Sequence, residues 1–170
     1  MRPGVGQGEE VDRAAAGIEL GRPAPDFTLR DQFGQDVTLS SYRGTKAVAL
    51  VFYPYAFSGV CTGELSAIRA RLDELLTFDT EVLALSCDPI YALRHFSDTD
   101  GLNFPLLSDF WPHGEVAKAY GVFDDVDGCP ERSTYVVGRD GVLTWAVHST
   151  KTAARDVDSL VAALHAAADR

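Results

Sequence analysis

Residues 47–64 read AVALVFYPYAFSGVCTGE, and this stretch decides the fold. Its first seven residues, 47–53, form a continuous apolar run, which is typical of a central strand that is covered on both faces. Pro54 ends this run, and Ser58 or the glycine after it can begin a helix. We therefore expect Cys61 to lie just after a buried strand, in the first turn of a helix.

A cysteine in the first turn of a helix is placed to be reactive. Unpaired backbone N–H groups and the positive end of the helix dipole stabilise an anion there, and the thiolate is the nucleophilic form of cysteine. A second cysteine three residues on would allow dithiol exchange, but that residue is Glu64. The stretch therefore predicts a thiolate that is oxidised by an acceptor with its own leaving group, namely a hydroperoxide.

The rest of the chain predicts an α/β domain of the thioredoxin-like kind, with a mixed central sheet, flanking helices and an N-terminal β-hairpin. Residues 1–19 are rich in Gly, Glu and Ala and are expected to form a flexible N-terminal extension, which leaves one domain over residues 20–170. In chain order we expect a hairpin over 26–39, the strand over 47–53, a helix to about residue 78, a strand over 81–88, a helix over 90–98, a short helix over 115–120, a hairpin of 132–137 with 142–147, and a helix over 155–168.

Composition excludes several classes of function. A formal net charge of −10 argues against a general nucleic-acid binder, because phosphate contacts need clustered Lys and Arg. The first residues contain no apolar signal-peptide core and no later run has membrane-spanning length, so we expect a cytoplasmic protein. Three cysteines without a Cys-x-x-Cys pair, and four scattered histidines, give no reason to expect a metal or another cofactor.

The residues around Cys61 suit reduction of a peroxide. When a thiolate displaces an alkoxide from a peroxide, negative charge builds on the departing oxygen, and hydrogen-bond donors must point at it. Ser58 offers a hydroxyl, and the amides of Val60 and Cys61 lie at the helix start. Arg132 opens a predicted strand, and from that strand end its guanidinium could reach an adjacent helix start and stabilise the thiolate.

At this point the residues resemble a known family. The pattern Pro54-x-x-x-Ser58-x-x-Cys61, with Glu64 three residues on and Arg132 at the head of a late strand, is similar to the peroxiredoxin signature Pro-x-x-x-Thr/Ser-x-x-Cys plus Arg. The resemblance implies a thioredoxin-like fold and a thiol-dependent peroxidase, an oxidoreductase that acts on hydrogen peroxide and organic hydroperoxides.

The resemblance covers most of the chain, from Ala24 to about Val147. Within it, residues 56–61, 104–114 and 119–123 look most like the one-cysteine alkyl hydroperoxide reductase E branch of actinobacterial peroxiredoxins.

Each motif position carries a role in the family. The resemblance implies that Cys61 is the peroxidatic cysteine and becomes a sulfenic acid, that Ser58 holds the peroxide and that Arg132 stabilises the thiolate and the transition state. Pro54 would shield the reactive sulfur from solvent, and Glu64 would support Arg132 by hydrogen bonding. Ser58 stands where Thr is usual; it keeps the hydroxyl and loses the methyl group that limits its rotamers, so slower turnover is expected.

The fate of the sulfenic acid is less sharply determined. Some relatives carry a resolving cysteine five residues after the peroxidatic one, but here that residue is Ser66, and no cysteine follows Cys129. Cys87 ends a predicted strand and is expected to be a small core residue. Cys129 lies three residues before Arg132, in an expected flexible loop near the site, so a two-cysteine cycle that uses Cys129 stays open. The favoured interpretation is a one-cysteine cycle, in which the resemblance implies an external thiol reductant, either mycothiol with a glutaredoxin-like protein or a thioredoxin-like protein.

Two further questions remain open at this level. Residues 110–113, Phe-Trp-Pro-His, are either packing residues or part of a dimer surface, and the resemblance favours a homodimer. The alternatives to a peroxidase are a peroxide sensor or redox relay that passes oxidation to a partner protein, and a non-catalytic binding module with a thioredoxin fold.

Overall fold

The computed structural model describes residues 18–77, 79–149 and 155–169. Its centre is a seven-stranded sheet, and the strands of the described chain are β1 (Thr28–Arg30), β2 (Asp36–Thr38), β3 (Ala47–Phe52), β4 (Thr80–Ser86), β5 (Leu106–Ser108), β6 (Phe123–Asp124), β7 (Cys129–Pro130), β8 (Ser133–Val137) and β9 (Leu143–His148). The order in the sheet is β2-β1-β5-β4-β3-β8-β9, while β6 and β7 pair with each other. The mixed sheet expected from the sequence is therefore confirmed.

Strand β3 lies deep in the sheet because both of its faces are apolar. It runs parallel to β4 and antiparallel to β8, and all six of its residues are buried. Alternate side chains point to opposite faces, so Ala49 and Val51 join one core cluster while Leu50 and Phe52 join the other. The two faces explain why this strand reads as a continuous apolar run.

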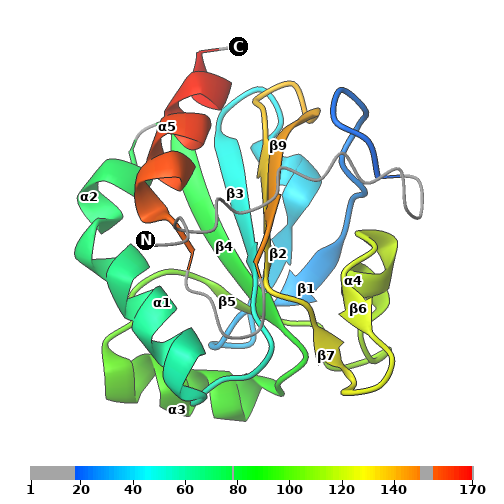
Figure 1. Cartoon of the computed structure of the whole chain (residues 1–170), viewed down its shortest axis with the longest axis vertical. Helices are drawn as coiled ribbons and strands as arrows, with labels where there is room; N and C mark the ends of the chain where they lie inside the picture. The colour runs from blue at the N-terminus through cyan, green and yellow to red at the C-terminus, as the bar shows by residue number, and fades with distance from the viewer. Residues whose placement is uncertain (1–17, 78, 150–154, 170) are drawn as a thin grey trace, which may run out of the picture.

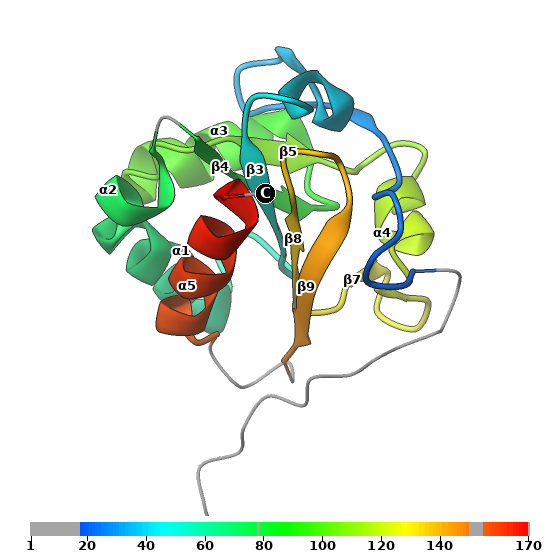
Figure 2. The ribbon, with the colours of Figure 1, turned by 90° about the horizontal axis from the view of Figure 1, so that it is seen from above.

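Helices cover both faces of the sheet (Figure 1). They are the 3-10 helix η1 (Leu39–Tyr42) and the α-helices α1 (Gly59–Ala70), α2 (Leu72–Leu75), α3 (Ile90–Asp100), α4 (Glu115–Ala119) and α5 (Val157–Ala168). Figure 2 shows α1, α2, α3 and α5 on one side of the sheet and α4, with the β6–β7 pair, on the other. The start of α1 lies at the end of β3, where the sequence predicts the reactive cysteine.

The helix predicted to begin at Ser58 or Gly59 and to run to about Phe78 does begin at Gly59, but it is interrupted, so the predicted continuous helix is wrong. Helix α1 ends at Ala70, and Arg71 leaves the helical conformation, with φ −115° and ψ 22°. The side chain of Arg71 forms ion pairs with Glu74 and with Asp158 of α5. Leu75 of α2 packs in the same core cluster as Leu160 and Leu164 of α5.

The other predicted elements agree with the structure within a few residues. Strands β1 and β2 form an antiparallel hairpin, as do β8 and β9. Helix α5 begins at Val157 because the side chain of Asp156 caps it by accepting a hydrogen bond from the amide of Asp158 at 3.0 Å. Most of the predicted N-terminal extension, residues 1–17, lies outside the described residues, whereas Ile18 is buried in the core.

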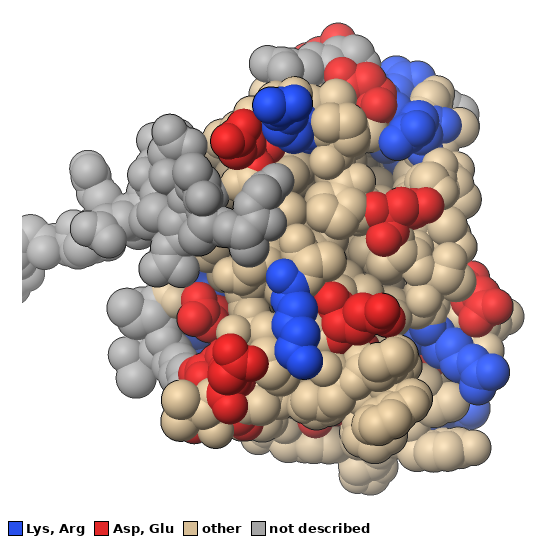
Figure 3. Space-filling model, turned by 90° about the vertical axis from the view of Figure 1, so that its right-hand side faces the viewer, with Lys and Arg blue, Asp and Glu red and all other residues tan. Residues whose placement is uncertain are grey.

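Charged side chains of both signs are interspersed on the face that lies on the α4 side of the molecule (Figure 3). No broad basic surface is present in that view. Across the described parts of the chain, no helix combines the length and the apolar character needed to cross a bilayer.

Candidate active site

Ser58 caps the helix that carries the candidate nucleophile. Its backbone is extended, and its Oγ accepts a hydrogen bond from the amide of Cys61 at 3.3 Å. Its carbonyl oxygen accepts the amide of Thr62 at 2.8 Å, which closes the first turn of α1. The side chain of Cys61 is 0% exposed. The Cys61 amide, which the sequence suggested as a donor to peroxide, therefore already donates its hydrogen bond to Ser58 Oγ.

The loop between β3 and α1 is fixed from both sides. Pro54 is buried, and the amide of Ala56 donates to Asp88 Oδ2 at 2.9 Å. Phe57 adopts a left-handed backbone, with φ 67°, which is uncommon for a residue with a side chain. Its half-exposed ring packs on Phe96 of α3, with ring centroids 5.0 Å apart. These contacts hold the turn that leads into the cap at Ser58.

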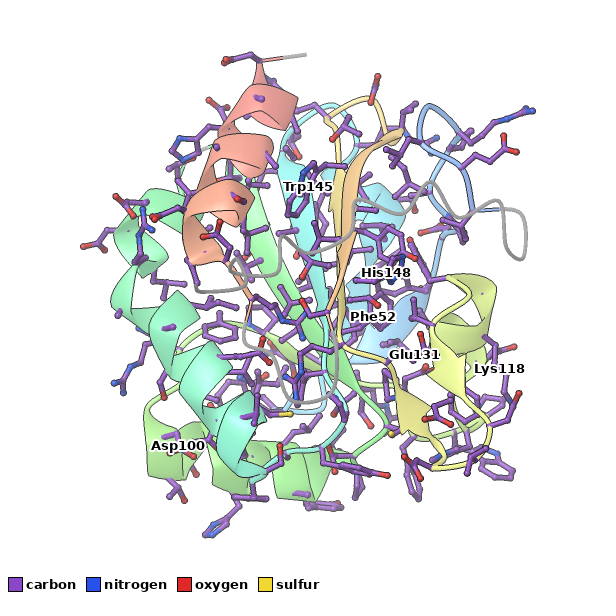
Figure 4. All side chains as sticks on the ribbon, viewed as in Figure 1. Phe52, Asp100, Lys118, Glu131, Trp145 and His148 are labelled. Atoms are coloured by element: carbon purple, nitrogen blue, oxygen red, sulfur yellow. The ribbon has the colours of Figure 1, made fainter. Side chains whose placement is uncertain are left out.

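Arg132 contacts Cys61 from just before the strand next to β3. Its Nη2 donates to Cys61 Sγ at 3.4 Å, although the two residues are 71 positions apart in the sequence. The contact arises because β8 pairs with β3, so that Ser133 lies opposite Phe52 and places Arg132 at the end of β3. Figure 4 marks this end of the sheet with Phe52 of β3, His148 of β9 and Glu131.

Glu64, one turn after Cys61 on α1, lies against Arg132. Its Oε1 forms an ion pair with Arg132 Nη1, and both side chains are almost completely buried. Glu64 Oε2 faces a second guanidinium, with Arg155 Nε at 3.1 Å. The structure therefore brings together Ser58, Cys61, Glu64 and Arg132 of the motif and adds Arg155, whereas Pro54 is buried in the preceding loop.

Sequence reasoning missed Arg155. Its side chain is 4% exposed, and its Nη1 donates to the carbonyl of Ser133 at 2.7 Å and to Thr134 Oγ1 at 2.8 Å. Its Nη2 donates to the carbonyl of Phe52, and its amide donates to Glu64 Oε2 at 2.9 Å. One feature of the sequence could have pointed to it. Arg155 stands just before a helix start, where the helix dipole disfavours a positive charge, so an arginine at that position indicates a specific role.

Two buried guanidinium groups and one carboxylate lie together beside Cys61. Burial, followed by repulsion from Arg132, lowers the pKa of Arg155 to about 9, which still leaves its guanidinium protonated at pH 7. Two guanidinium groups therefore face one carboxylate, Glu64. The arrangement is suited to a nucleophilic sulfur with a donor already aimed at it.

The other two thiols lie outside this cluster. All three cysteines are reduced and buried. Burial, with smaller contributions from Asp109 and Cys129, raises the pKa of Cys87 to about 12. Cys129, expected in a flexible loop, lies instead in the short strand β7, with 1% of its surface exposed, so that expectation is wrong. In the described residues no group of three His, Cys, Asp or Glu side chains is arranged to hold a metal ion.

Comparison with known proteins identifies the family of this chain. Residues 20–146 match the AhpC/TSA family. Alkyl hydroperoxide reductase E of Mycobacterium tuberculosis is 50% identical over 129 residues, which are 76% of this chain and 84% of that protein. Peroxiredoxin 2 of Thermoplasma acidophilum is 31% identical over 153 residues, with 86% of this chain and 75% of that protein covered.

Solved structures show the same architecture. Peroxidoxin BcpB from Mycobacterium tuberculosis superposes with a TM-score of 0.76 at 30% identity and covers 86% of this chain and 96% of its own. The AhpC protein of Enterococcus faecalis gives a TM-score of 0.78 at 27% identity, over 86% of this chain and 90% of its own. The thioredoxin-like fold expected from the sequence is thereby confirmed. The chain belongs to the AhpC/TSA family and is a peroxiredoxin of the alkyl hydroperoxide reductase E type, a thiol-dependent peroxidase.

Proposed function

We propose that Cys61 is the peroxidatic cysteine and that it reduces hydrogen peroxide and organic hydroperoxides. The observation that carries this proposal is the 3.4 Å contact between Arg132 Nη2 and the buried Cys61 Sγ. The Cys61 thiolate attacks one peroxide oxygen, the O–O bond breaks, and the alkoxide leaves and takes up a proton. Cys61 is left as a sulfenic acid, while Arg132 stabilises the thiolate and the charge that develops on the two oxygens.

The neighbouring residues take distinct roles in this proposal. Ser58 Oγ accepts from the Cys61 amide, so its own hydroxyl proton can be donated to a peroxide oxygen. Glu64 positions the guanidinium of Arg132 through their ion pair. Pro54, which is buried in the loop before the helix, shields the sulfur from water.

We further propose that the cycle uses one cysteine. Cys129 is paired in β7 and buried, so a bond to Cys61 would require that strand to open. An external thiol then reduces the sulfenic acid, either mycothiol with a glutaredoxin-like protein or a thioredoxin-like protein. Two external thiols restore Cys61 and leave as their disulfide, with release of water. The reaction takes place in the cytoplasm, where such reductants are kept reduced.

A homodimer is the expected assembly. Tyr55, Phe57, Phe110 and Trp111 are exposed large apolar side chains, and Trp111 is 81% exposed. Exposed aromatic groups of this kind are enriched at protein interfaces, and a second copy of the chain is the proposed partner. Sedimentation at micromolar concentration tests this; a monomer at all concentrations would count against it.

Rapid mixing with one equivalent of hydrogen peroxide tests the proposed function. We expect a fast change in tryptophan fluorescence in the wild type and none in Cys61→Ser, with Cys61 identified as the sulfenic acid by dimedone labelling and peptide mapping. Cys87→Ser is the matched control, because it also removes a buried thiol and should react at the wild-type rate. A wild type that reacts no faster than a simple thiol would refute the assignment of Cys61, and a Cys61–Cys129 disulfide in high yield would refute the one-cysteine cycle.

A further inference from the structure

Asp88 lies two residues after the end of β4 and holds the loop that precedes the candidate nucleophile. Its Oδ2 accepts a hydrogen bond from the amide of Ala56 at 2.9 Å, although the two residues are 32 positions apart in the sequence. Ala56 lies two residues before Ser58, whose Oγ accepts the amide of Cys61. This carboxylate therefore connects the end of β4 to the turn that places the reactive sulfur.

The Asp88 carboxylate is itself held by two strands of the sheet. Ser86 of β4, which is 0% exposed, donates its hydroxyl to Asp88 Oδ2 at 2.8 Å. Ser108 of β5, which lies opposite Ser86, donates its hydroxyl to the carbonyl of Asp88 at 2.6 Å. Helix α3 begins at Ile90, and the positive end of its dipole also stabilises a negative charge at Asp88. Asp88 thus offers the Ala56 amide an acceptor whose position is set by the sheet.

The loop between β3 and α1 needs such a hold, because its backbone is not in a relaxed conformation. Phe57, directly after Ala56, has φ 67°, a left-handed conformation that residues with a side chain rarely adopt. Such a conformation persists only where the surrounding contacts impose it. The bond from Ala56 to Asp88 and the packing of the Phe57 ring on Phe96 are contacts of this kind. Loss of the bond to Asp88 would therefore release the turn that leads into Ser58.

The donor that faces the sulfur is anchored independently of this loop. Arg132 directly precedes β8, and Ser133 at the start of β8 is paired with Phe52 of β3. The 3.4 Å contact between Arg132 Nη2 and Cys61 Sγ thus joins a donor placed by the sheet to a sulfur placed by the loop and its helix cap. A displacement of about 1 Å in such an arrangement can cost roughly 100-fold in rate.

We infer that Asp88 is a positioning residue for the peroxide step. Through the amide of Ala56 it holds the loop before α1, and this hold keeps Cys61 Sγ aligned with the guanidinium of Arg132. Asp88 takes no part in the making or breaking of bonds. This role rests on the proposed function, in which Cys61 is the peroxidatic cysteine and an external thiol reduces its sulfenic acid.

The two half-reactions should respond differently when this hold is lost. Attack on the peroxide needs the aligned site, so its rate falls when the loop is released. An external thiol such as glutathione is much larger than hydrogen peroxide, and the side chain of Cys61 is 0% exposed. The loop must therefore move aside before such a thiol reaches the sulfur, and a released loop does not slow that step.

Asp88→Ala in the full chain tests the role, because both half-reactions can be measured on one protein. Rapid mixing with one equivalent of hydrogen peroxide gives the oxidation rate of Cys61, which we expect to fall roughly 10- to 100-fold. A second mixing step with glutathione gives the reduction rate of the sulfenic acid, which should equal or exceed that of the wild type. Asp88→Asn keeps an oxygen that can accept from the Ala56 amide, so it should recover most of the oxidation rate.

Asp26→Ala is the matched control. Asp26 Oδ1 accepts the amides of Phe27 and Ser40, both at 2.9 Å, so this carboxylate also links two segments of the chain. Asp26 lines a surface hollow together with Lys46, which directly precedes β3, so it lies at the end of β3 opposite to Cys61. Its loss should lower the stability in urea unfolding and change both rates less than about twofold.

Hydrogen exchange at the Ala56 amide, followed by NMR in the reduced wild type, makes the result independent of the folding of the variants. We expect this amide to be protected. Exchange as fast as in an unfolded peptide would overturn the inference, as would an Asp88→Ala protein that is oxidised at the wild-type rate or that loses both half-reactions equally. A wild type whose Cys61 is not oxidised would refute the proposed function instead.

Discussion

Glu64 is shared between two buried arginines: its Oε2 lies 3.1 Å from Arg155 Nε, while its Oε1 pairs with Arg132. Only Arg132 also donates to Cys61 Sγ. The carboxylate therefore ties the guanidinium that contacts the sulfur to one that is anchored on the carbonyls of Ser133 and Phe52, at the ends of β8 and β3. The position of the donor beside Cys61 is thus set by the central sheet itself.

Arg155→Gln should impair both stability and peroxide reduction. It removes donors from two backbone carbonyls and leaves Glu64 with one arginine, so we expect a loss of about 3–5 kcal/mol in the free energy of unfolding. The peroxide rate should fall roughly 10- to 100-fold, as for other misplaced donors. Urea unfolding and rapid mixing measure the two effects. Arg139→Gln is the control, because that side chain is partly exposed and should change the rate less than about twofold.

Glu64→Gln should separate stabilisation of the thiolate from positioning of Arg132. The neutral amide leaves two cations near Cys61, so the thiolate should stay favoured and the rate of alkylation by iodoacetamide should change less than about threefold. Arg132 loses its charged partner and its fixed position, so the peroxide rate should drop roughly 10- to 100-fold. Equal losses in both rates would show that Glu64 acts through ionisation of the thiol and not through position.

Variants of Ser58 should separate the helix cap from the hydroxyl donor. Ser58→Ala removes the acceptor for the Cys61 amide, at a cost of about 1 kcal/mol in stability, and it removes a donor to peroxide, which should lower the rate roughly 100-fold. Ser58→Thr keeps both functions and limits the rotamers of the hydroxyl, so its rate should equal or exceed that of the wild type. Urea unfolding and peroxide kinetics on both variants provide the measurement. A Ser58→Ala protein that reduces peroxide as fast as the wild type would argue against a role for the hydroxyl.

Much of this site was predictable from the sequence, because the geometry that creates it is local or follows from strand pairing. Ser58, Cys61 and Glu64 lie on one helix start, so their spacing fixes their relation. Arg132 precedes a strand, and the pairing of that strand with β3 brings it to Cys61. The prediction required only that these two strands be neighbours.

What the sequence did not reveal depends on contacts that leave no periodic pattern. Arg155 is one arginine among many, and only the path of the chain into α5 brings it to Glu64. Strands β6 and β7 have two residues each, too few for an alternating pattern, so the burial of Cys129 was missed. The break at Arg71 was hidden because Leu75 keeps its apolar spacing across it.

The raised pKa of Cys87, about 12, predicts a specific loss of stability at alkaline pH. The folded protein holds the Cys87 proton more tightly than the unfolded chain, whose thiol titrates near 9.0. The contribution of the protonated Cys87 thiol to the free energy of unfolding is therefore complete below pH 9, and it is lost as the pH rises toward 12. Urea unfolding in the presence of a reductant should show the stability advantage of the wild type over Cys87→Ala shrinking between pH 8 and pH 10.5. Because both proteins share every other titrating group, Tyr53 and Tyr120 included, their contributions cancel in the difference. An advantage that stays constant over this range would show that Cys87 ionises as readily in the folded state as in the unfolded chain.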